Sequence, residues 1–180
     1  MSEAGGEMIF AVRTDLQRRI IMSQRAEEIA KRFTNFNNEL IAFVESCSDE
    51  DWTKVCPGEN WPVGVIARHL AAGHYRALGL AKMIVEGKEL PELSREGIDQ
   101  ANAQHAEKHA GCTKEEVLGL LRKNGSAIAD YVAALDDADL DRTGHLALAG
   151  GAISTQQVID NIIVQSATEH LASVKAATGK

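Results

Sequence analysis

Aromatic residues and prolines are scarce in this chain of 180 residues. Phe, Trp and Tyr make up 4% of the sequence, and the prolines are Pro57, Pro62 and Pro91. With so few large rings, the core must be built mainly from Ala, Leu, Ile and Val. Because proline is the strongest helix breaker and alanine and leucine are good helix formers, this composition favours an all-α fold.

The chain also lacks an excess of positive charge. Its formal net charge is −7 and its isoelectric point is about 5.4. Basic residues near the N-terminus, such as Arg18, Arg25 and Lys31, are interleaved with acids, as on a solvated helix face. Proteins that bind a phosphate backbone need a basic surface. We therefore expect no nucleic-acid partner.

Long apolar runs and paired cysteines are missing as well. The apolar run Met8–Val12 is too short for a signal peptide, and no stretch approaches the roughly 18 apolar residues of a membrane span. Cys47, Cys56 and Cys112 form no CxxC pair, which fits a reducing compartment and gives neither a disulfide framework nor a zinc finger. We expect a cytoplasmic protein with no membrane interaction.

The stretch Trp61–Gly87 predicts a long central helix. Pro62 suits the first helical position and Gly87 suits the stop. His69 and His74 lie at the two edges of its apolar face, which directs an imidazole toward the core. The residues of that face recur at spacings of three and four, the mark of one buried helical side: Ile66, Leu70, Gly73, Ala77, Leu80 and Ile84.

The same periodicity predicts three other long helices. The first spans about residues 22–47 and contains three of the four phenylalanines. The third begins after Thr113 and the last after Ser154, each at a capping-box pattern completed by Glu116 and Gln157.

A shorter helix is expected at about residues 94–110. The sequence therefore predicts an all-α four-helix bundle with an extra short helix between helices two and three. Uneven loop lengths mean that the order need not be a simple up-and-down meander. We expect residues 1–20 to form an N-terminal arm and residues 21–180 to form the bundle domain. Between the third and last helices, residues 136–151 are predicted to be a loop.

Several residues with reactive side chains have competing interpretations. His105 and His109 share a helix face at a spacing that can clip a metal, but their polar neighbours favour a solvated surface helix. Cys112 precedes a helix start, where a thiol pKa can be lowered, yet no base accompanies it. His145 has no near partner. Trp61 either walls a pocket or closes the end of the core.

Two histidines point inward by periodicity. His69 belongs to the second long helix, and His170 to the last, four residues after Ser166. Bundles build metal sites from side chains on facing helices, and two imidazoles with oxygen ligands suit zinc or nickel. The alternative is that each is a hydrogen-bonded core histidine.

Three segments resemble the DinB/YfiT-like superfamily. They are VIARHLA after Trp61, NAQHAEKHAGCTKEEVLGLLRKNG from Asn102, and EHLASVK near the C-terminus. The resemblance covers roughly residues 20–178. That superfamily includes mycothiol- and bacillithiol-dependent enzymes, among them the mycothiol-dependent maleylpyruvate isomerase group. The resemblance implies a four-helix bundle from a bacterial protein.

The resemblance also implies a metal held by three side chains. His69 and His170 match two of the family's ligands. Ser166 stands where the family carries His or Glu, and a serine hydroxyl is a poor ligand. The metal is then bound weakly, recruits His105 or His109, or is absent.

Two functions follow from this resemblance. The first is a divalent-metal-dependent enzyme of the thiol-transferase/isomerase or hydrolase kind that acts on a small molecule. His69 and His170 would hold zinc or nickel, which would activate a low-molecular-weight thiol or water, while Ser166 would orient that water and Trp61 would wall the pocket. The second is a non-catalytic bundle with a degenerate metal site, which binds a small ligand or dimerises. In both cases we expect a homodimer.

Overall fold

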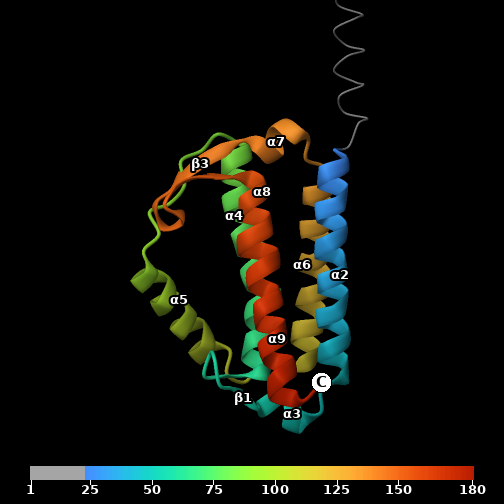
Figure 1. The fold of residues 1–180 in the computed structure, drawn as a ribbon. Helices are drawn as coiled ribbons and strands as arrows, with labels where there is room; N and C mark the ends of the chain where they lie inside the picture. The colour runs from blue at the N-terminus through green and yellow to red at the C-terminus, as the bar shows by residue number, and fades with distance from the viewer. Residues whose placement is uncertain (1–22) are drawn as a thin grey trace, which may run out of the picture.

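Four long helices form the protein in a computed structural model that describes residues 23–180 (Figure 1). The all-α four-helix bundle is confirmed. The predicted arm, residues 1–20, and the run Met8–Val12 lie outside the described residues. The bundle helices are α2 (Gln24–Ser46), α4 (Val63–Val85), α6 (Lys114–Ala133) and a C-terminal helix made of α8 (Thr155–Gln157), η2 (Val158–Gln165) and α9 (Ser166–Thr178).

The order of the helices is not a simple meander. In Figure 1, α2 and the C-terminal helix run down the page, whereas α4 and α6 both run up it. α2 packs against α6, and α4 packs against both α6 and the C-terminal helix. The parallel step from α4 to α6 requires a long connection, and this connection contains the predicted short helix, α5 (Arg95–Lys108), which lies outside the bundle.

The core follows the predicted apolar faces. On α2, Phe33, Phe36 and Phe43 are buried, and the faces of the other three helices close around them. α4 ends as predicted, because Gly87 has a φ of +67°, a left-handed conformation that glycine adopts without strain. Pro62, expected as the first helical residue, is instead the residue just before the helix.

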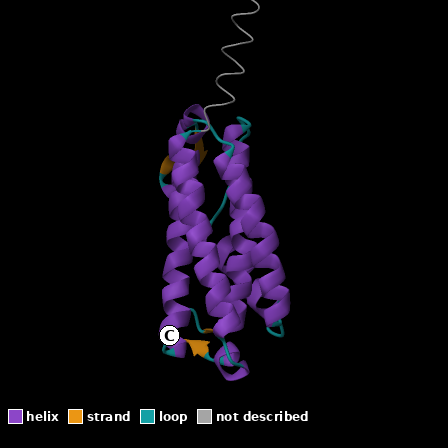
Figure 2. Ribbon diagram, turned by 90° about the vertical axis from the view of Figure 1, so that its right-hand side faces the viewer, coloured by secondary structure: helices purple, strands orange, loops and turns teal. Residues whose placement is uncertain are grey.

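Short elements close the two ends of the bundle (Figure 2). Near the C-terminus lie α3 (Asp49–Thr53) and the antiparallel pair β1 (Val55–Cys56) and β2 (Trp61–Pro62). The prediction of a loop at residues 136–151 was wrong, because the backbone groups of this segment pair within a small ribbon. It holds α7 (Asp137–Asp141), η1 (Ala147–Ala149) and the strands β3 (Thr143–Leu146) and β4 (Gly151–Ser154), which pair antiparallel with Thr143 opposite Ser154.

One of the two predicted capping boxes forms completely, and in the other only one of the two hydrogen bonds forms. Ser154 and Gln157 cap each other's backbone at the start of α8. Thr113 accepts a hydrogen bond from the backbone N–H of Glu116, as expected. The carboxylate of Glu116, however, pairs with Arg68 of α4, whose Nε lies 2.7 Å from Glu116 Oε1. An ion pair between two helices has replaced the local contact.

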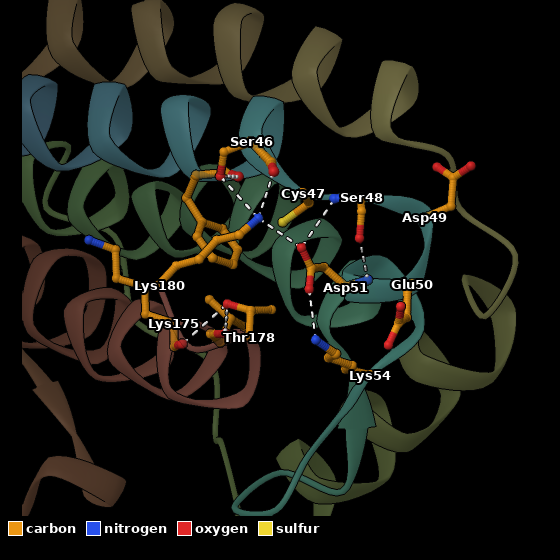
Figure 3. Close-up of polar contacts among 12 residues, drawn as sticks. Ser46, Cys47, Ser48, Asp49, Glu50, Asp51, Lys54, Lys175, Thr178 and Lys180 are labelled. Carbon is orange, nitrogen blue, oxygen red and sulfur yellow. Dashed lines mark hydrogen bonds and ion pairs between the residues drawn. The ribbon is translucent and has the colours of Figure 1, made fainter.

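The C-terminal residue ties α9 to the loop after α2 (Figure 3). Lys180 Nζ donates to the carbonyl oxygen of Ser46 at 2.6 Å and lies 2.8 Å from Asp51 Oδ2. Lys54 Nζ donates to the other oxygen of Asp51 at 2.9 Å. The hydrogen bond from Lys180, with that from Lys54, holds the pKa of Asp51 well below its usual range. This cluster fixes the end of the bundle that lies nearest the candidate site.

The C-terminal helix changes its winding in the middle. Residues Val158–Gln165 are π-helical, with α-helix on both sides. Such segments are rare, and they are often found at functional sites. Among residues 23–180, no helix is long and apolar enough to cross a membrane.

Candidate functional site

A cavity of about 350 Å³ opens between α4, α5 and the C-terminal helix. Of the four residues predicted for the site, His69, Ser166 and His170 line this cavity together. Trp61 is not among the lining residues, but its ring lies edge-on to His69 with 5.7 Å between the ring centroids. The other polar side chains on the wall are His74, Arg76 and Asn102.

Helical spacing accounts for the placement of the C-terminal residues. Ile162, Ser166 and His170 follow one another at intervals of four residues, and all three line the cavity. His170 therefore points inward, as predicted. Its ring centroid lies 5.8 Å from that of His69, and the two rings are nearly perpendicular.

A carboxylate that the sequence did not single out orients His170. Nδ1 of His170 lies 2.8 Å from Oε1 of Glu59, and the Ser173 hydroxyl donates to Oε2 of Glu59 at 2.6 Å. Burial alone would raise the pKa of Glu59, but the hydrogen bonds from Ser173 and His170 bring it below its usual value. The carboxylate is therefore ionised and accepts a hydrogen bond from Nδ1, so that in a neutral His170 imidazole the lone pair is on Nε2.

Glu59 comes from the turn between β1 and β2. The next residue, Asn60, has a φ of +57°, a left-handed conformation that asparagine tolerates better than most residues. The sequence shows only a Pro-Gly turn signal here, so no local pattern reveals that a glutamate in it will reach α9.

The prediction for the short helix was wrong at one residue. α5 is polar, as expected, but His105 is buried, with 6% of its surface exposed. Its ring lies 5.3 Å from that of His69, at an angle of 80°. His109 is only half-buried, and its ring lies 4.7 Å from that of His105. His105 is thus a neighbour of the candidate site, because α5 folds back over α4.

The buried imidazoles are held in their neutral form. Burial lowers the pKa of His69 to about 4, and repulsion from His105 and His170 in their protonated forms lowers it further. Burial also lowers the pKa of His105 to about 4 and that of His74 to about 3. Neutral imidazole is the form that binds a metal ion.

Two of these rings carry a buried nitrogen without a partner. Within residues 23–180, neither Nδ1 of His69 nor Nε2 of His105 has a hydrogen-bonding group in reach. Buried polar atoms are nearly always paired, and an exception points to strain, catalysis, or a bound water or ion. The orphaned nitrogen of His69 therefore favours a ligand there over a satisfied core histidine, whereas His170 has its partner in Glu59.

The donor set fits a metal ion in part. Because a zinc–nitrogen bond is about 2.0–2.1 Å long, two imidazoles on one tetrahedral ion have centroids about 5 Å apart. The separations of His69 from His170 and from His105 lie close to this value. However, no group of three or more His, Cys, Asp or Glu side chains in the described part of the chain is arranged to hold a metal. The residues fit a two-imidazole site whose further donors are not preformed.

Cys112 has no features of a nucleophile. Its thiol donates to the carbonyl oxygen of Gly64 at 3.3 Å. Burial raises the pKa of this thiol, which outweighs any effect of the α6 N-terminus. The backbone carbonyl of Cys112 accepts a hydrogen bond from the Trp52 indole at 2.9 Å. The two contacts tie the segment before α6 to α4 and to α3, so the role of Cys112 is structural.

Comparisons with known proteins agree with the fold described above. Residues 32–171 match the family model of the DinB superfamily. A similar solved structure is YfiT from Bacillus subtilis, described as a "probable metal-dependent hydrolase with an unusual four-helix bundle topology". The TM-score is 0.70 at 14% sequence identity, and the alignment covers 87% of each chain, which shows a shared fold. The comparison with curated proteins found no match.

Proposed function

Because the chain belongs to the DinB superfamily, we propose that it is a divalent-metal-dependent enzyme acting on a small molecule, with its centre at His69 and His170. One observation carries this proposal. His170 is oriented by an ionised Glu59, and it faces His69 across a cavity at a ring separation suited to a shared ion. A carboxylate that binds the far nitrogen of a ligating histidine is a recurrent feature of metal sites.

Zinc or nickel suits two imidazole donors with open positions. When bound, such an ion would supply a lowered pKa for a coordinated water or thiol, and so a nucleophile near neutral pH. The reaction class is therefore hydrolysis or transfer to a low-molecular-weight thiol. YfiT, which shares the fold, is described as a hydrolase of this general kind.

The chain's own residues bind and orient the substrate. The Ser166 hydroxyl lines the cavity one turn before His170, where it can donate or accept a hydrogen bond to a substrate or water. Neutral His74 offers one donor and one acceptor on the same wall. Trp61 packs edge-on against His69 and limits the movement of that ring. A volume of about 350 Å³ admits a small molecule only.

A second candidate is a non-catalytic bundle with a degenerate site. The observation in its favour is Ser166, whose hydroxyl replaces a strong donor, together with the lack of a preformed three-donor group among residues 23–180. In this case the cavity binds a small ligand, or the helix faces form a homodimer.

Metal content separates the two candidates. Purified wild type, His170→Ala and His145→Ala are incubated with zinc or nickel, freed of excess ion, and measured by inductively coupled plasma mass spectrometry. His145 lies exposed on β3 and does not line the cavity, so it serves as the matched control. We expect about one ion per chain in wild type and His145→Ala, and a loss in His170→Ala. Wild type without metal under both conditions would leave the non-catalytic bundle as the better account.

A further inference from the structure

The cavity of the candidate site carries a positive charge and no acid. Its lining residues include neither Asp nor Glu, and the one with a permanent charge is Arg76. The carboxylate that supports the site, Glu59, is not among them and is engaged by His170 and Ser173. In a chain with a net charge of −7, a cavity of this composition is a local exception. The cavity therefore favours an anion over a cation.

Arg76 has no partner of its own in the described part of the chain. Within residues 23–180, neither Arg76 nor Arg95 makes an ion pair or a side-chain hydrogen bond, and Arg95 is exposed and does not line the cavity. The other five arginines of this range are each held by a carboxylate or a backbone carbonyl: Arg25, Arg32, Arg68, Arg122 and Arg142. Arg76 is thus the unpaired arginine that a ligand in the cavity can use.

Helical spacing puts Arg76 on the same face of α4 as His69. His69, Gly73 and Arg76 follow one another at intervals of four and three residues, and all three line the cavity. Burial and neighbouring imidazoles lower the pKa values of His69 and His105, and the charge of Arg76 lowers both further, so its guanidinium lies on the α5 side of α4. Seven residues of helix span about 10 Å, so a small molecule can reach both His69 and Arg76.

The floor of the cavity between these two residues carries no side chain. A Cβ added to Gly73 would have the His69 ring as its nearest neighbour, at 3.7 Å, an ordinary contact distance. Leu70, Ile98 and Ile162 supply apolar walls from three different helical segments. A short carbon skeleton fits this middle part of the cavity, with a polar group at each end.

We propose that the substrate is a small organic acid, whose carboxylate is bound by Arg76 and whose other end reaches His69 and His170. A guanidinium binds a carboxylate through two parallel N–H···O bonds. Asn102 lines the cavity from α5, and its side-chain amide can donate a further hydrogen bond to the same group. The inference names the substrate class of the proposed enzyme, and it rests on the proposed function for the statement that the bound acid is a substrate.

The test measures the binding of butyrate to metal-free protein, in which no ion competes with Arg76 for the carboxylate. Isotopically labelled, chelator-treated protein is titrated by NMR with butyrate, and in parallel with 1-butanol and butylammonium, which have the same carbon chain without a negative charge. The shifts of amides 69–77 and 98–102 report the place and the affinity of binding. Arg76→Gln removes the proposed contact, and Arg95→Gln removes the same charge outside the cavity. Thermal unfolding checks that both variants are folded.

We expect butyrate to shift amides of α4 and α5 and to bind more tightly than 1-butanol or butylammonium. Arg76→Gln should weaken butyrate binding by roughly fivefold or more, and Arg95→Gln should bind butyrate within about twofold of wild type. Wild-type affinity in Arg76→Gln, or equal binding of butylammonium and butyrate, would overturn the inference. The metal content of the same wild-type protein, measured after incubation with zinc or nickel, tests the proposed function separately. Butyrate binding through Arg76 without any uptake of metal would overturn the proposed function and leave the organic acid as the ligand of a non-catalytic bundle.

Discussion

Glu59 and His170 meet across 111 positions of the chain, with 2.8 Å between Oε1 of Glu59 and Nδ1 of His170. The contact joins the β1–β2 turn to the last helix, and the Ser173 hydroxyl holds the second carboxylate oxygen. It fixes both the orientation and the tautomer of His170. The strength of the proposed metal binding should therefore depend on a residue that would not itself contact the ion.

Glu59→Gln should weaken zinc or nickel binding by about 10- to 100-fold, as changes to such supporting carboxylates usually do. The amide keeps the shape but removes the charge that holds a proton on Nδ1. Titration against a competing chelator measures the affinity. Ser173→Ala should have a smaller effect in the same direction. Equal affinity in Glu59→Gln and wild type would show that the carboxylate serves the fold alone.

Replacing His74 by leucine (His74→Leu) should make the free energy of unfolding less dependent on pH. His74 packs against Phe33 and Phe36, with ring centroids 6.4 and 5.8 Å away, and burial lowers its pKa from 6.5 to about 3. As the pH falls below 6.5, the unfolded chain takes up a proton that the folded chain refuses, so stability falls with pH. One such group contributes about 1.4 kcal/mol per pH unit.

Urea unfolding of metal-free protein between pH 6.5 and 5 measures this slope. His69 and His105 have lowered pKa values as well, so His74→Leu should remove only part of the dependence of the unfolding free energy on pH. His145→Leu, the same change at an exposed position of β3, is measured in parallel as the matched control. An unaltered slope in His74→Leu would mean that His74 is protonated within the fold.

Gly64→Ala and Gly79→Ala should change stability in opposite directions. A Cβ on Gly64 would lie 2.5 Å from the Trp52 indole, which is fixed by its hydrogen bond to Cys112. Forcing that ring aside costs about 1–3 kcal/mol. A Cβ on Gly79, in the same helix, meets nothing within 4 Å, so alanine should stabilise by about 0.5–1 kcal/mol. Thermal unfolding of both variants checks the pair, and a stabilised Gly64→Ala would contradict the packing described.

Asp51→Asn should lower the unfolding temperature by clearly more at pH 7 than at pH 2.5. Hydrogen bonds from Lys180 and Lys54 depress the pKa of Asp51, so its contribution to stability is present above about pH 4 and is lost as the carboxylate is protonated. The two thermal curves should therefore converge in acid. Glu50→Gln, which removes a carboxylate from an exposed neighbour on α3, is the matched control. A constant difference between Asp51→Asn and wild type at all pH values would exclude this ionic origin.

The helices were predictable because their signals are local. The apolar spacing of α4 and the caps at Ser154 and Gly87 each lie within a few residues of the structure they determine. The strands β3 and β4 were missed because each is four residues long and shows no alternation of apolar and polar side chains.

About half of the candidate site could be predicted from the sequence. His69 and His170 sit on apolar helix faces, so their direction could be inferred from periodicity. The positions of Glu59 and His105 depend instead on how a turn and an outlying helix dock on the bundle. No pattern around His105 distinguishes a solvated histidine from a buried one, because the residue it meets is 36 positions earlier in the chain.

The π-helical segment Val158–Gln165 lies between two parts of one helix that have different roles. Before it, the helix starts at a capping box beside the β3–β4 ribbon, and after it the helix carries His170. A π-helical turn holds about one residue more than an α-helical turn, because its hydrogen bonds join residues five apart. The segment therefore takes up an extra residue while the helix continues on both sides. The capping box at Ser154 and the cavity wall at Ser166 and His170 are in this way set independently of each other.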